Sequence, residues 1–355
     1  MIILTAKIIK RILLGLFVFF LVLAGLVTYV IFWPFSTPQD APTVAFKIKW
    51  GTSFSAVADD LQAQGLVDSA RFFKLSAQIL NKENDIKAGL FNLKQGMSNY
   101  HILKTLTSGQ QSFIKITIPE GLSSFQIAGL LAKRLELDSA RLVSVMQDPV
   151  LIEARKIPAS SLEGYLFPET YLFTYGLSER QVVNELLKQF DKNVPDSLYD
   201  RAEGIGFTMH QIVTLASIIQ GEAVVSSEMD TVSSVYHNRL NRRMLLQADP
   251  TVQYIISDGP RRLLHRDLQI DSPYNTYLYP GLPPGPINNP GRKAIYAALY
   301  PIKSDYIFFV ANGDGTHSFT ATLTQHLNAK KRLDALRRQI ARNKKRPSDN
   351  AGNTQ

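Results

Sequence analysis

The sequence predicts an α+β protein that combines a single N-terminal transmembrane helix, small β-α-α units and a larger mixed α+β domain. Three observations lead to this prediction. The chain begins with a long apolar stretch that contains no charge. A pattern of strand, glycine turn and two helices then occurs twice, at an offset of 70 residues. The remaining half alternates amphipathic helices and short strands with Pro-rich loops.

The apolar stretch runs from Ile12 to Trp33 and is 22 residues long, enough for a helix to span a hydrocarbon core of about 30 Å. Three basic residues precede it, and none follows until Lys47. The positive-inside rule therefore places the amino terminus in the cytoplasm and the rest of the chain across the membrane. A cleaved signal peptide would have a shorter apolar region and a small-x-small end, so we expect an uncleaved anchor.

The composition excludes several kinds of site. The chain has no Cys, which rules out disulfides, thiolate zinc sites, cysteine nucleophiles and an acylated-Cys anchor. Its six His residues show no metal-ligand spacing. The sequence also lacks a GxxxxGK[ST] phosphate loop and a GxSxG nucleophile turn. We therefore expect neither a metal nor a cofactor.

The net charge of +9 is concentrated near the C-terminus. Residues 330–346 contain nine Lys or Arg and one acid, Asp334, so the rest of the chain is nearly neutral. Such a tail is most often a solvated end, although it could also contact anionic lipid or wall polymer. It contains no nucleic-acid motif and no interleaved aromatics, so we expect no nucleic-acid partner.

The two copies of the repeat start at Phe46 and at Lys115. Each begins with an alternating strand and a glycine turn, at Gly51 or Gly121, and continues with an amphipathic helix and a second helix that opens at Asp-Ser. A further strand and helix are expected between the copies. The first copy resembles LysM modules, which bind glycans containing N-acetylglucosamine. A plain packing module is the alternative.

One carboxylate, Glu222, lies inside the apolar stretch QIVTLASIIQGEAVV at 211–225. At 100° per residue, Leu215, Ile218, Ile219 and Glu222 share one helix face, while Gln220 points about 200° away. The sequence therefore predicts that the acid is buried and that the Gln220 amide is exposed. A carboxylate among apolar neighbours is costly to ionise, so we expect a raised pKa for Glu222. A raised pKa is how a general acid is made at neutral pH.

Two other interpretations of Glu222 stay open at the level of sequence. It could be a structural carboxylate paired with a nearby cation such as Arg239. The helix could also end at Gly221, just before the acid, because glycine commonly ends helices.

Amides, hydroxyls and aromatics accumulate on Pro-containing loops after Glu222. Short hydrogen-bonding groups beside flat rings suit a sugar site, although a peptide groove would use them too. The candidate substrate-binding residues are Glu163, Asn238, Gln247, Asp249, Tyr254, Tyr274, Asn275 and His317.

A set of motifs occurs in a fixed order along the chain: EGYLFPETY, ASIIQGEA, LLQADPTVQY, YNTY, GLPPGPINNPG and FVANGDGTHSFT. With the N-terminal anchor and the LysM-like unit, this set resembles the YceG-like endolytic murein transglycosylases over about residues 1–335. The resemblance implies a single-pass inner-membrane enzyme with a periplasmic catalytic domain. Its partners would be the glycan strands of peptidoglycan, which it cuts internally to leave 1,6-anhydro-N-acetylmuramic acid ends, and peptidoglycan synthases.

The family's catalytic Glu falls on Glu222. Many members carry a second acid two residues earlier, where this chain has Gln220, so that acid has no role here. A lytic transglycosylase needs only one carboxyl group, because the sugar's own 6-hydroxyl is the nucleophile. Two rivals remain: a hydrolase that uses Glu222 with Asp249 or Glu163, and a non-catalytic wall-binding scaffold.

The motifs and composition together predict the following boundaries. The segments are a cytoplasmic tail at 1–11, a transmembrane helix at 12–33, a linker at 34–44, a LysM-like module at 45–110, a second β-α-α repeat at 111–158, a catalytic domain at 159–335 and a basic, disordered tail at 336–355.

Overall fold

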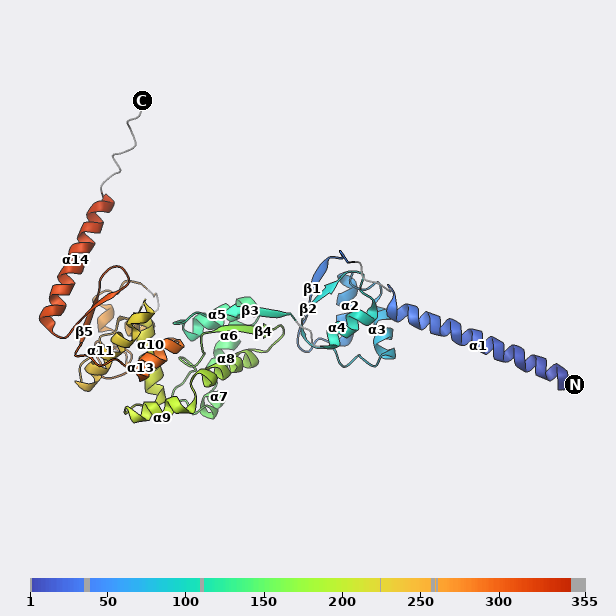
Figure 1. Ribbon diagram of the computed structural model, residues 1–355, viewed down its shortest axis with the longest axis horizontal. Coiled ribbons are helices and arrows are strands. Elements are labelled where there is room, and N and C mark those ends of the chain that lie inside the picture. Colours follow the sequence, from blue (N-terminus) through green and yellow to red (C-terminus); the bar gives the residue numbers. More distant parts are fainter. Residues whose placement is uncertain are drawn as a thin grey trace, which may run out of the picture. The chain divides into compact units, whose positions relative to one another are not determined.

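The computed structural model describes residues 2–34, 39–108, 112–223, 225–256, 259 and 261–345. The fold is mixed α+β, as predicted, and it divides into two compact units (Figure 1). The N-terminal unit comprises the chain up to Ile116 together with Tyr171–Ser178, and the C-terminal unit comprises Thr117–Thr170 together with the chain from Glu179 on. Residues 35–38 of the predicted linker and 346–355 of the predicted tail lie outside the described residues.

The N-terminal unit is built from one long helix, three short helices and two paired strands, and two more strands connect it to the C-terminal unit. Its elements are α1 (Ile2–Phe32), β1 (Thr43–Ile48), α2 (Phe54–Ala63), α3 (Ala70–Ile79), β2 (Gly89–Lys94), α4 (Asn99–Ser108), β3 (Phe113–Thr117) and β4 (Thr170–Thr174). Strand β3 leads out of the unit and β4 returns to it. Strands β1 and β2 pair antiparallel, as β5 and β6 do further along, and β3 pairs with β4.

The C-terminal unit is mainly helical. Its helices are α5 (Ser124–Leu135), α6 (Ser139–Met146), α7 (Pro149–Ala154), α8 (Glu179–Asn193), α9 (Asp196–Gly204), α10 (Met209–Glu222), α11 (Met229–Asn241), α12 (Asp249–Ile255), α13 (Arg292–Leu299) and α14 (Leu323–Lys345). Two 3-10 turns, at Ser226–Glu228 and Asp267–Gln269, and the hairpin strands β5 (Phe308–Ala311) and β6 (His317–Thr320) complete it.

Helix α1 contains one segment, Lys7–Phe32, that is long and apolar enough to cross a membrane. Its last turn does not stand free, because Val30 and Ile31 are buried against the rest of the N-terminal unit. The Val30 carbonyl accepts hydrogen bonds from Ser76 Oγ at 3.2 Å and Asn99 Nδ2 at 2.8 Å. The helix is therefore fixed to α3 and α4 before the linker begins.

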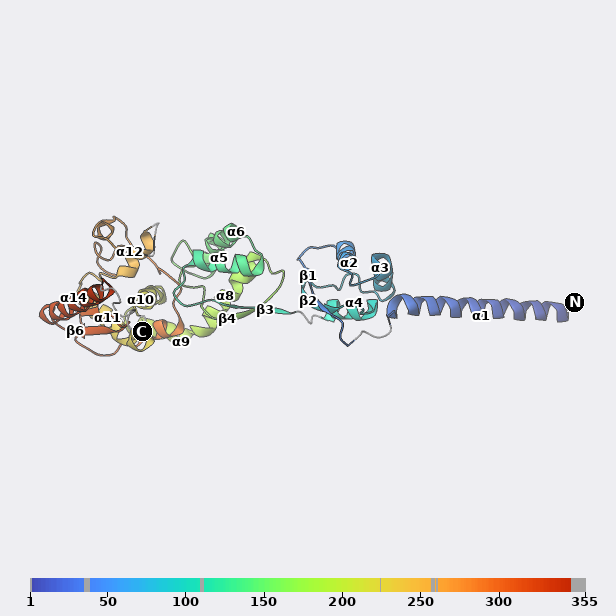
Figure 2. The same cartoon turned by 90° about the horizontal axis from the view of Figure 1, so that it is seen from above.

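The N-terminal unit has one apolar core beneath the β1–β2 pair. Alternation along β1 turns Phe46 and Ile48 inward, and β2 contributes Phe91 and Leu93 to the same face. Helices α2, α3 and α4 pack on that core, and Figure 2 shows them gathered around the two strands. This β-α-α-β arrangement leaves the polar positions of both strands facing outward.

The repeat seen in the sequence recurs in the structure. Gly51 and Gly121 both occupy left-handed turns, with φ of 80° and 79°, between a strand and a helix. The equivalent serines, Ser53 and Ser123, cap α2 and α5 through their side chains. The helices of the two copies nevertheless lie in different units, and those of the second copy, predicted as a separate segment at 111–158, share their unit with the following helices.

Helix α10 lies at the centre of the C-terminal unit. It contacts α9, α11, α12 and α13, and every residue from Ile212 to Ile219 is buried. A helix that is apolar on all sides can only be stable when other elements surround it. The two hydroxyls within it, Thr214 and Ser217, satisfy themselves by donating to the backbone carbonyls of His210 and Thr214.

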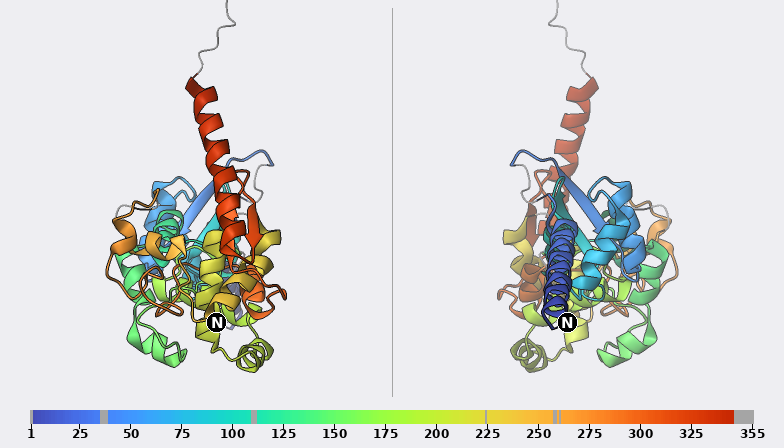
Figure 3. Two further views of the ribbon diagram at one scale, coloured as in Figure 1. Left: turned by 90° about the vertical axis from the view of Figure 1, so that its left-hand side faces the viewer. Right: turned by 90° about the vertical axis from the view of Figure 1, so that its right-hand side faces the viewer.

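The C-terminal hairpin forms as predicted, with Ala311 opposite His317 across β5 and β6. Helix α14 packs on both strands through buried Ala329 and Leu333 (Figure 3). It then continues to Lys345, so the tail predicted to be disordered from residue 336 is helical as far as that residue. Arg, Lys, Leu, Ala and Gln are strong helix formers, which explains how the helix extends beyond its packed part.

Gly164 allows the EGYLF segment to pack against helix α10 and against the loop that contains Pro286. Its φ is +88°, and a Cβ there would lie 2.4 Å from Pro286 Cγ and 2.8 Å from Val213 Cγ1. Residues with a side chain rarely adopt this backbone conformation, and a Cβ does not fit the space.

We predict that Gly164→Ala strongly destabilises the protein. Left-handed strain of about 1–2 kcal/mol should add to an overpacking cost of about 1–3 kcal/mol. Urea unfolding of the full chain in detergent, followed by circular dichroism, measures the loss. Gly206→Ala is the matched control, since Gly206 has φ +82° with nothing within 4 Å of its Cβ position. Equal losses in the two variants would contradict the packing argument.

Candidate functional site

Helix α10 carries Glu222 as its last residue. The helix starts at a capping box, in which Thr208 and Gln211 satisfy each other's backbone amides, and it ends because Ala223 turns to an extended conformation. Gly221 is still helical, so the alternative in which it ends the helix before the acid is wrong. The helix is therefore buried along most of its length, and its last residue places one carboxyl group where it is partly exposed.

Protein atoms crowd the carboxyl group of Glu222, although the residue keeps intermediate exposure. Tyr236 on α11 donates a hydrogen bond to Oε1 at 3.0 Å. Burial, followed by the negative charge of Asp249, raises the pKa of Glu222 to about 7, while hydrogen bonds from Tyr236 and the Asp249 backbone partly oppose the rise. The expected raised pKa is confirmed, and partial exposure leaves a route for a proton.

Arg239 does not neutralise Glu222. Its guanidinium group donates to the carbonyl oxygens of Ile307 at 2.7 Å and Leu246 at 2.8 Å, and so ties α11 to two loops. Among the residues that the structure describes, Glu222 forms no ion pair. The interpretation of Glu222 as half of a structural salt bridge with Arg239 is therefore wrong, because the guanidinium group is hydrogen-bonded to backbone carbonyls instead.

Gln220 does not face solvent as its helical angle suggested. It is half-buried, and its Oε1 accepts the Gly291 amide hydrogen at 3.1 Å, at the start of α13. Glu120, from the turn that opens the second repeat, approaches the same glycine so closely that a Cβ there would lie 1.9 Å from its Oε1. Two loops, the turn with Glu120 and the segment before α13, thus meet beside the end of α10.

Asp249 is the acid that acts on Glu222. A Cβ on Gly221 would lie 2.7 Å from Pro250 Cβ, so only glycine lets α12 approach α10 this closely. Asp249 is exposed and accepts a short hydrogen bond from the Tyr277 hydroxyl. Burial and that bond to Asp249 raise the pKa of Tyr277, which keeps the phenol a donor.

The remaining residues of the QADP and YNTY motifs fix the backbone around Asp249 and Tyr277. Gln247 takes a left-handed backbone, with φ 49°, and its backbone N–H donates to the Thr276 carbonyl at 3.0 Å. Asn275 is fully buried, and its side chain donates to the carbonyls of Leu268 and Ile270. The structure therefore gives Asn275 a scaffolding position, whereas Gln247 is exposed next to Asp249.

Three further residues of the predicted list have different surroundings. The rings of Tyr254 and Tyr274 lie 5.1 Å apart and form an aromatic surface. Glu163, by contrast, is only 4 % exposed, and its oxygens accept from the Ser124 backbone and from Asn289 Nδ2 at 2.8 Å. Burial raises the pKa of Glu163 to about 7.

His317 is linked to Glu222 through a chain of contacts. Its Nδ1 lies 2.8 Å from Glu228 Oε2, and its backbone amide donates to Oε1 of the same carboxylate. Its ring meets Phe309 edge to face at 5.3 Å, and Phe309 meets Tyr236 in the same way at 5.9 Å. Tyr236 is the hydrogen-bond donor to Glu222, so the β5–β6 hairpin contacts the residue that holds the acid in place.

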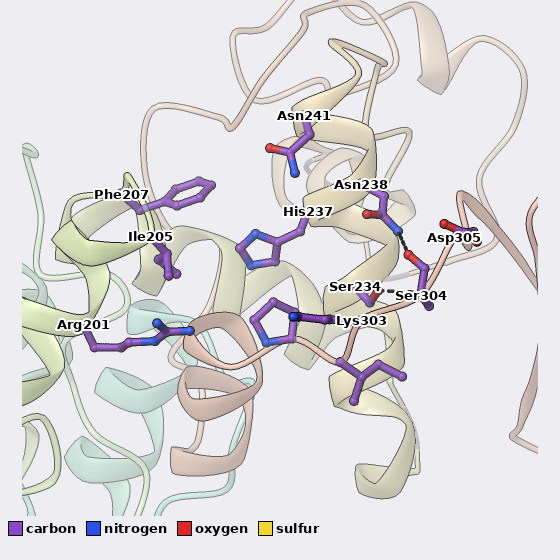
Figure 4. Close-up of a pocket in the computed structure, with 12 residues that line it drawn as sticks. Arg201, Ile205, Phe207, Ser234, His237, Asn238, Asn241, Lys303, Ser304 and Asp305 are labelled. Carbon is purple, nitrogen blue, oxygen red and sulfur yellow. Dashed lines mark hydrogen bonds between the residues drawn. The ribbon is translucent and has the colours of Figure 1, made fainter.

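Asn238 lies elsewhere. It lines a pocket of about 620 Å³ together with His237, shown in Figure 4, and its amide donates to the carbonyls of Ser304 and Tyr306. Asn238 is about 200° from Tyr236 around α11, so this pocket opens on the face opposite Glu222.

Sequence reasoning missed several residues that contact Glu222 or support other predicted site residues. Tyr236 lies in α11, and Glu228 lies in the 3-10 turn just before it. Nothing in the local sequence pattern indicates a role for either residue. Tyr277 belongs to the YNTY motif but is not among the predicted site residues. Its place in that motif was the available signal, and its contact with Asp249 becomes visible only in the structure. Asn289, fully buried in INNPG, could have been suspected only from its polarity among Pro and Ile.

A partly accessible acid with a raised pKa lies at the end of a buried helix, beside a second carboxylate and tyrosine hydroxyls, and so has the properties that general acid–base chemistry on glycans requires. A sequence profile of the YceG-like family matches residues 46–332. The chain belongs to that family, as the motif order had indicated.

Relatives support the assignment. A Bacillus subtilis protein named endolytic murein transglycosylase is 34 % identical over 306 residues, covering 82 % of this chain and 84 % of the relative. A Streptococcus pneumoniae protein of the same name is 29 % identical over 326 residues, covering 81 % of this chain and 59 % of the relative. A crystal structure of a yceG-like protein from Listeria monocytogenes has a TM-score of 0.57 at 33 % identity, covering 81 % of this chain and 99 % of that one.

We predict that Glu222 makes stability fall as pH rises. Its folded pKa of about 7 lies above the ordinary 4.5, so its stabilising contribution is complete below pH 4.5 and is lost as pH rises through 7. Glu222→Gln should therefore lose less stability than wild type between pH 4.5 and 8, by on the order of 1–3 kcal/mol.

Urea unfolding across that pH range measures the difference. Glu153→Gln, on the exposed side of α7, is the control and should follow the wild-type curve. A Glu222→Gln curve parallel to wild type would mean that the carboxyl is already ionised without cost in the folded protein.

Proposed function

We propose that this protein is an endolytic murein transglycosylase that cuts the MurNAc–GlcNAc bond of nascent peptidoglycan strands and leaves 1,6-anhydro-N-acetylmuramic acid ends, which helps to terminate glycan elongation. The observation that carries the proposal is Glu222, a single partly accessible acid with a pKa of about 7 in a chain 34 % identical to a protein of that name.

The proposed reaction uses Glu222 twice. Its carboxyl proton passes to the bridging glycosidic oxygen, and the bond from that oxygen to C1 of the muramyl sugar breaks. The resulting carboxylate then accepts the proton of the same sugar's 6-hydroxyl, whose oxygen closes on C1. The proton count balances and no water is consumed. A pKa near the working pH suits a group that must give and take a proton, and the tethered hydroxyl has a high effective molarity.

The neighbours of Glu222 have distinct proposed parts. Tyr236 holds the carboxyl group in place and stabilises its ionised form after proton donation. Exposed Gln247 and the tyrosine rings of Tyr254 and Tyr274 provide amide and aromatic surfaces of the sort that bind sugar. His317, held by Glu228, is proposed to orient substrate, whereas the contacts of Glu163, Asn275 and Asn238 favour scaffolding roles.

A hydrolase remains the second candidate, because Asp249 lies near enough to raise the pKa of Glu222. In that reaction Asp249 would act as base or nucleophile, as the second carboxylate of a glycosidase does. Glu163 is a poorer choice for the second group, since it is buried and its oxygens are occupied by amides. The two candidates differ in whether water enters the product.

We further propose a single-pass inner-membrane protein with a cytoplasmic amino terminus and a periplasmic catalytic domain. Helix α1 supports this through its apolar length, and the sequence places basic residues only on its N-terminal side. The β1-α2-α3-β2 part is proposed to be a LysM-like module that holds glycan, and peptidoglycan synthases are the proposed partners. The helices packed on an antiparallel strand pair support the LysM-like proposal.

We predict that Glu222→Gln abolishes glycan cleavage while the fold persists. Glutamine keeps the shape and can still accept a hydrogen bond from Tyr236, but it delivers no proton. Acid–base groups contribute about 10²–10⁴-fold, and a group used in both steps should reach the upper end. Cleavage of purified glycan strands and thermal melting, both on one preparation, test this.

Gln220→Glu is the matched control. A carboxylate there can still accept the Gly291 amide hydrogen, so activity should stay near wild type. Cleavage by a Glu222→Gln variant that melts early would assign Glu222 a structural role and move the acid to Asp249 or Glu163.

We predict that the reaction is non-hydrolytic. The products should be lighter than hydrolysis products by one water and should resist borohydride reduction, because the new end is an internal anhydro ring. Mass spectrometry after digestion in heavy-oxygen water makes the distinction. Heavy oxygen at the new end would instead support the hydrolase that pairs Glu222 with Asp249.

A further inference from the structure

Helix α3 carries an exposed apolar stripe. Phe72, Leu75 and Ile79 are 51 %, 41 % and 45 % exposed, and their spacing places them within about 60° of one another on one face. The core-facing side of the same helix is already filled by Phe73 and Ala77. An outward face of a soluble helix would normally be polar, so this second apolar face needs an occupant.

The stripe lies on the flank of α3 that faces α1. Ser76 is only about 40° around the helix from Phe72, and its hydroxyl donates to the Val30 carbonyl in the last turn of α1. A pocket of about 370 Å³ is lined by Phe72 together with Tyr29 and Trp33. Figure 1 shows α3 beside the C-terminal end of α1.

The depth of that last turn follows from the length of α1. About 20 residues at about 1.5 Å each cross a hydrocarbon core, so a span that begins near Ile12 reaches the opposite interface close to Phe32. Tyr29 and Trp33 stack there with ring centroids 5.3 Å apart, and such aromatics concentrate at membrane interfaces. Because Val30 is hydrogen-bonded to α3 and α4, those helices are held at the same depth.

We propose that α3 lies in the outer interface of the bilayer, with Phe72, Leu75 and Ile79 inserted among the lipid acyl chains. The proposal rests on the membrane anchoring proposed above for α1. It gives the N-terminal unit two adjoining contacts with lipid, so the unit is held against the membrane surface rather than tethered to it. A second copy of the chain fits less well, since three side chains offer far less than the roughly 1,200–2,000 Å² that stable protein interfaces bury.

The absence of Cys from the chain allows a direct test. Single cysteines at Leu75 and Ile79, each labelled with an environment-sensitive fluorophore, are reconstituted as full-length protein in phosphatidylcholine–phosphatidylglycerol vesicles, with or without nitroxide-bearing lipid. Phe19→Cys in α1 reports on the span. Asp60→Cys on α2 is the aqueous control, beside Asp59, which pairs with Lys74 on the opposite flank of α3.

We expect the Leu75 and Ile79 probes to emit at shorter wavelength than the Asp60 probe and to be quenched at least about twofold more by shallow nitroxides, as an interfacial helix requires. Quenching at Phe19 with water-like emission at 75 and 79 would overturn the proposal and leave the anchor intact. A water-like probe at Phe19 would overturn the anchoring as well. Blue-shifted emission that lipid nitroxides do not quench, and that fades on dilution with lipid, would assign the stripe to a second copy.

Discussion

The site at the end of α10 depends on the absence of a side chain at Gly221. A Cβ there would collide with Pro250, so any other residue would move α12 away from α10. Because Asp249 directly precedes Pro250, the same close approach fixes how near a second negative charge comes to Glu222. The pKa of Glu222 responds to burial and to that charge. A packing requirement at one glycine thus controls an acid–base property of its neighbour.

A buried amide provides the matching constraint on the other side. Asn289 accepts from the backbone of Gly164 and Leu166, both at 2.9 Å, and donates to Leu122 and Glu163. These contacts join the second repeat, the EGYLF segment and the INNPG loop, which are far apart in sequence. Both polar atoms of the Asn289 side chain are hydrogen-bonded, and buried contacts of this kind favour one arrangement of the loops that they join. The two repeat copies share secondary structure, but only the second contributes its turn, with Glu120, to the neighbourhood of Gln220.

Local signals predicted what depends on local physics. The apolar N-terminal helix, the two repeat copies, the hairpin and α10 all follow from periodicity, caps and glycine turns. The raised pKa of Glu222 follows in the same way from its neighbours Ile218 and Ile219. Tyr236 and the contact between Gly221 and Pro250 were out of reach, because they arise where separate helices pack and leave no periodic trace. The helical face alone also misjudged Gln220, since the Gly291 amide gave it a buried partner.

Glu163 and Glu222 show why a raised pKa by itself does not identify a catalytic acid. Burial raises both pKa values to about 7. The carboxyl group of Glu163 is surrounded by the amides of Ser124 and Asn289, and its exposure is too small for a substrate to reach it. Among the described residues, Tyr236 is the one side chain that donates a hydrogen bond to Glu222, which retains intermediate exposure. The first acid stabilises loops through its acceptor oxygens, whereas the proposed function requires the second to exchange a proton with a sugar, and only the second is exposed enough for that role.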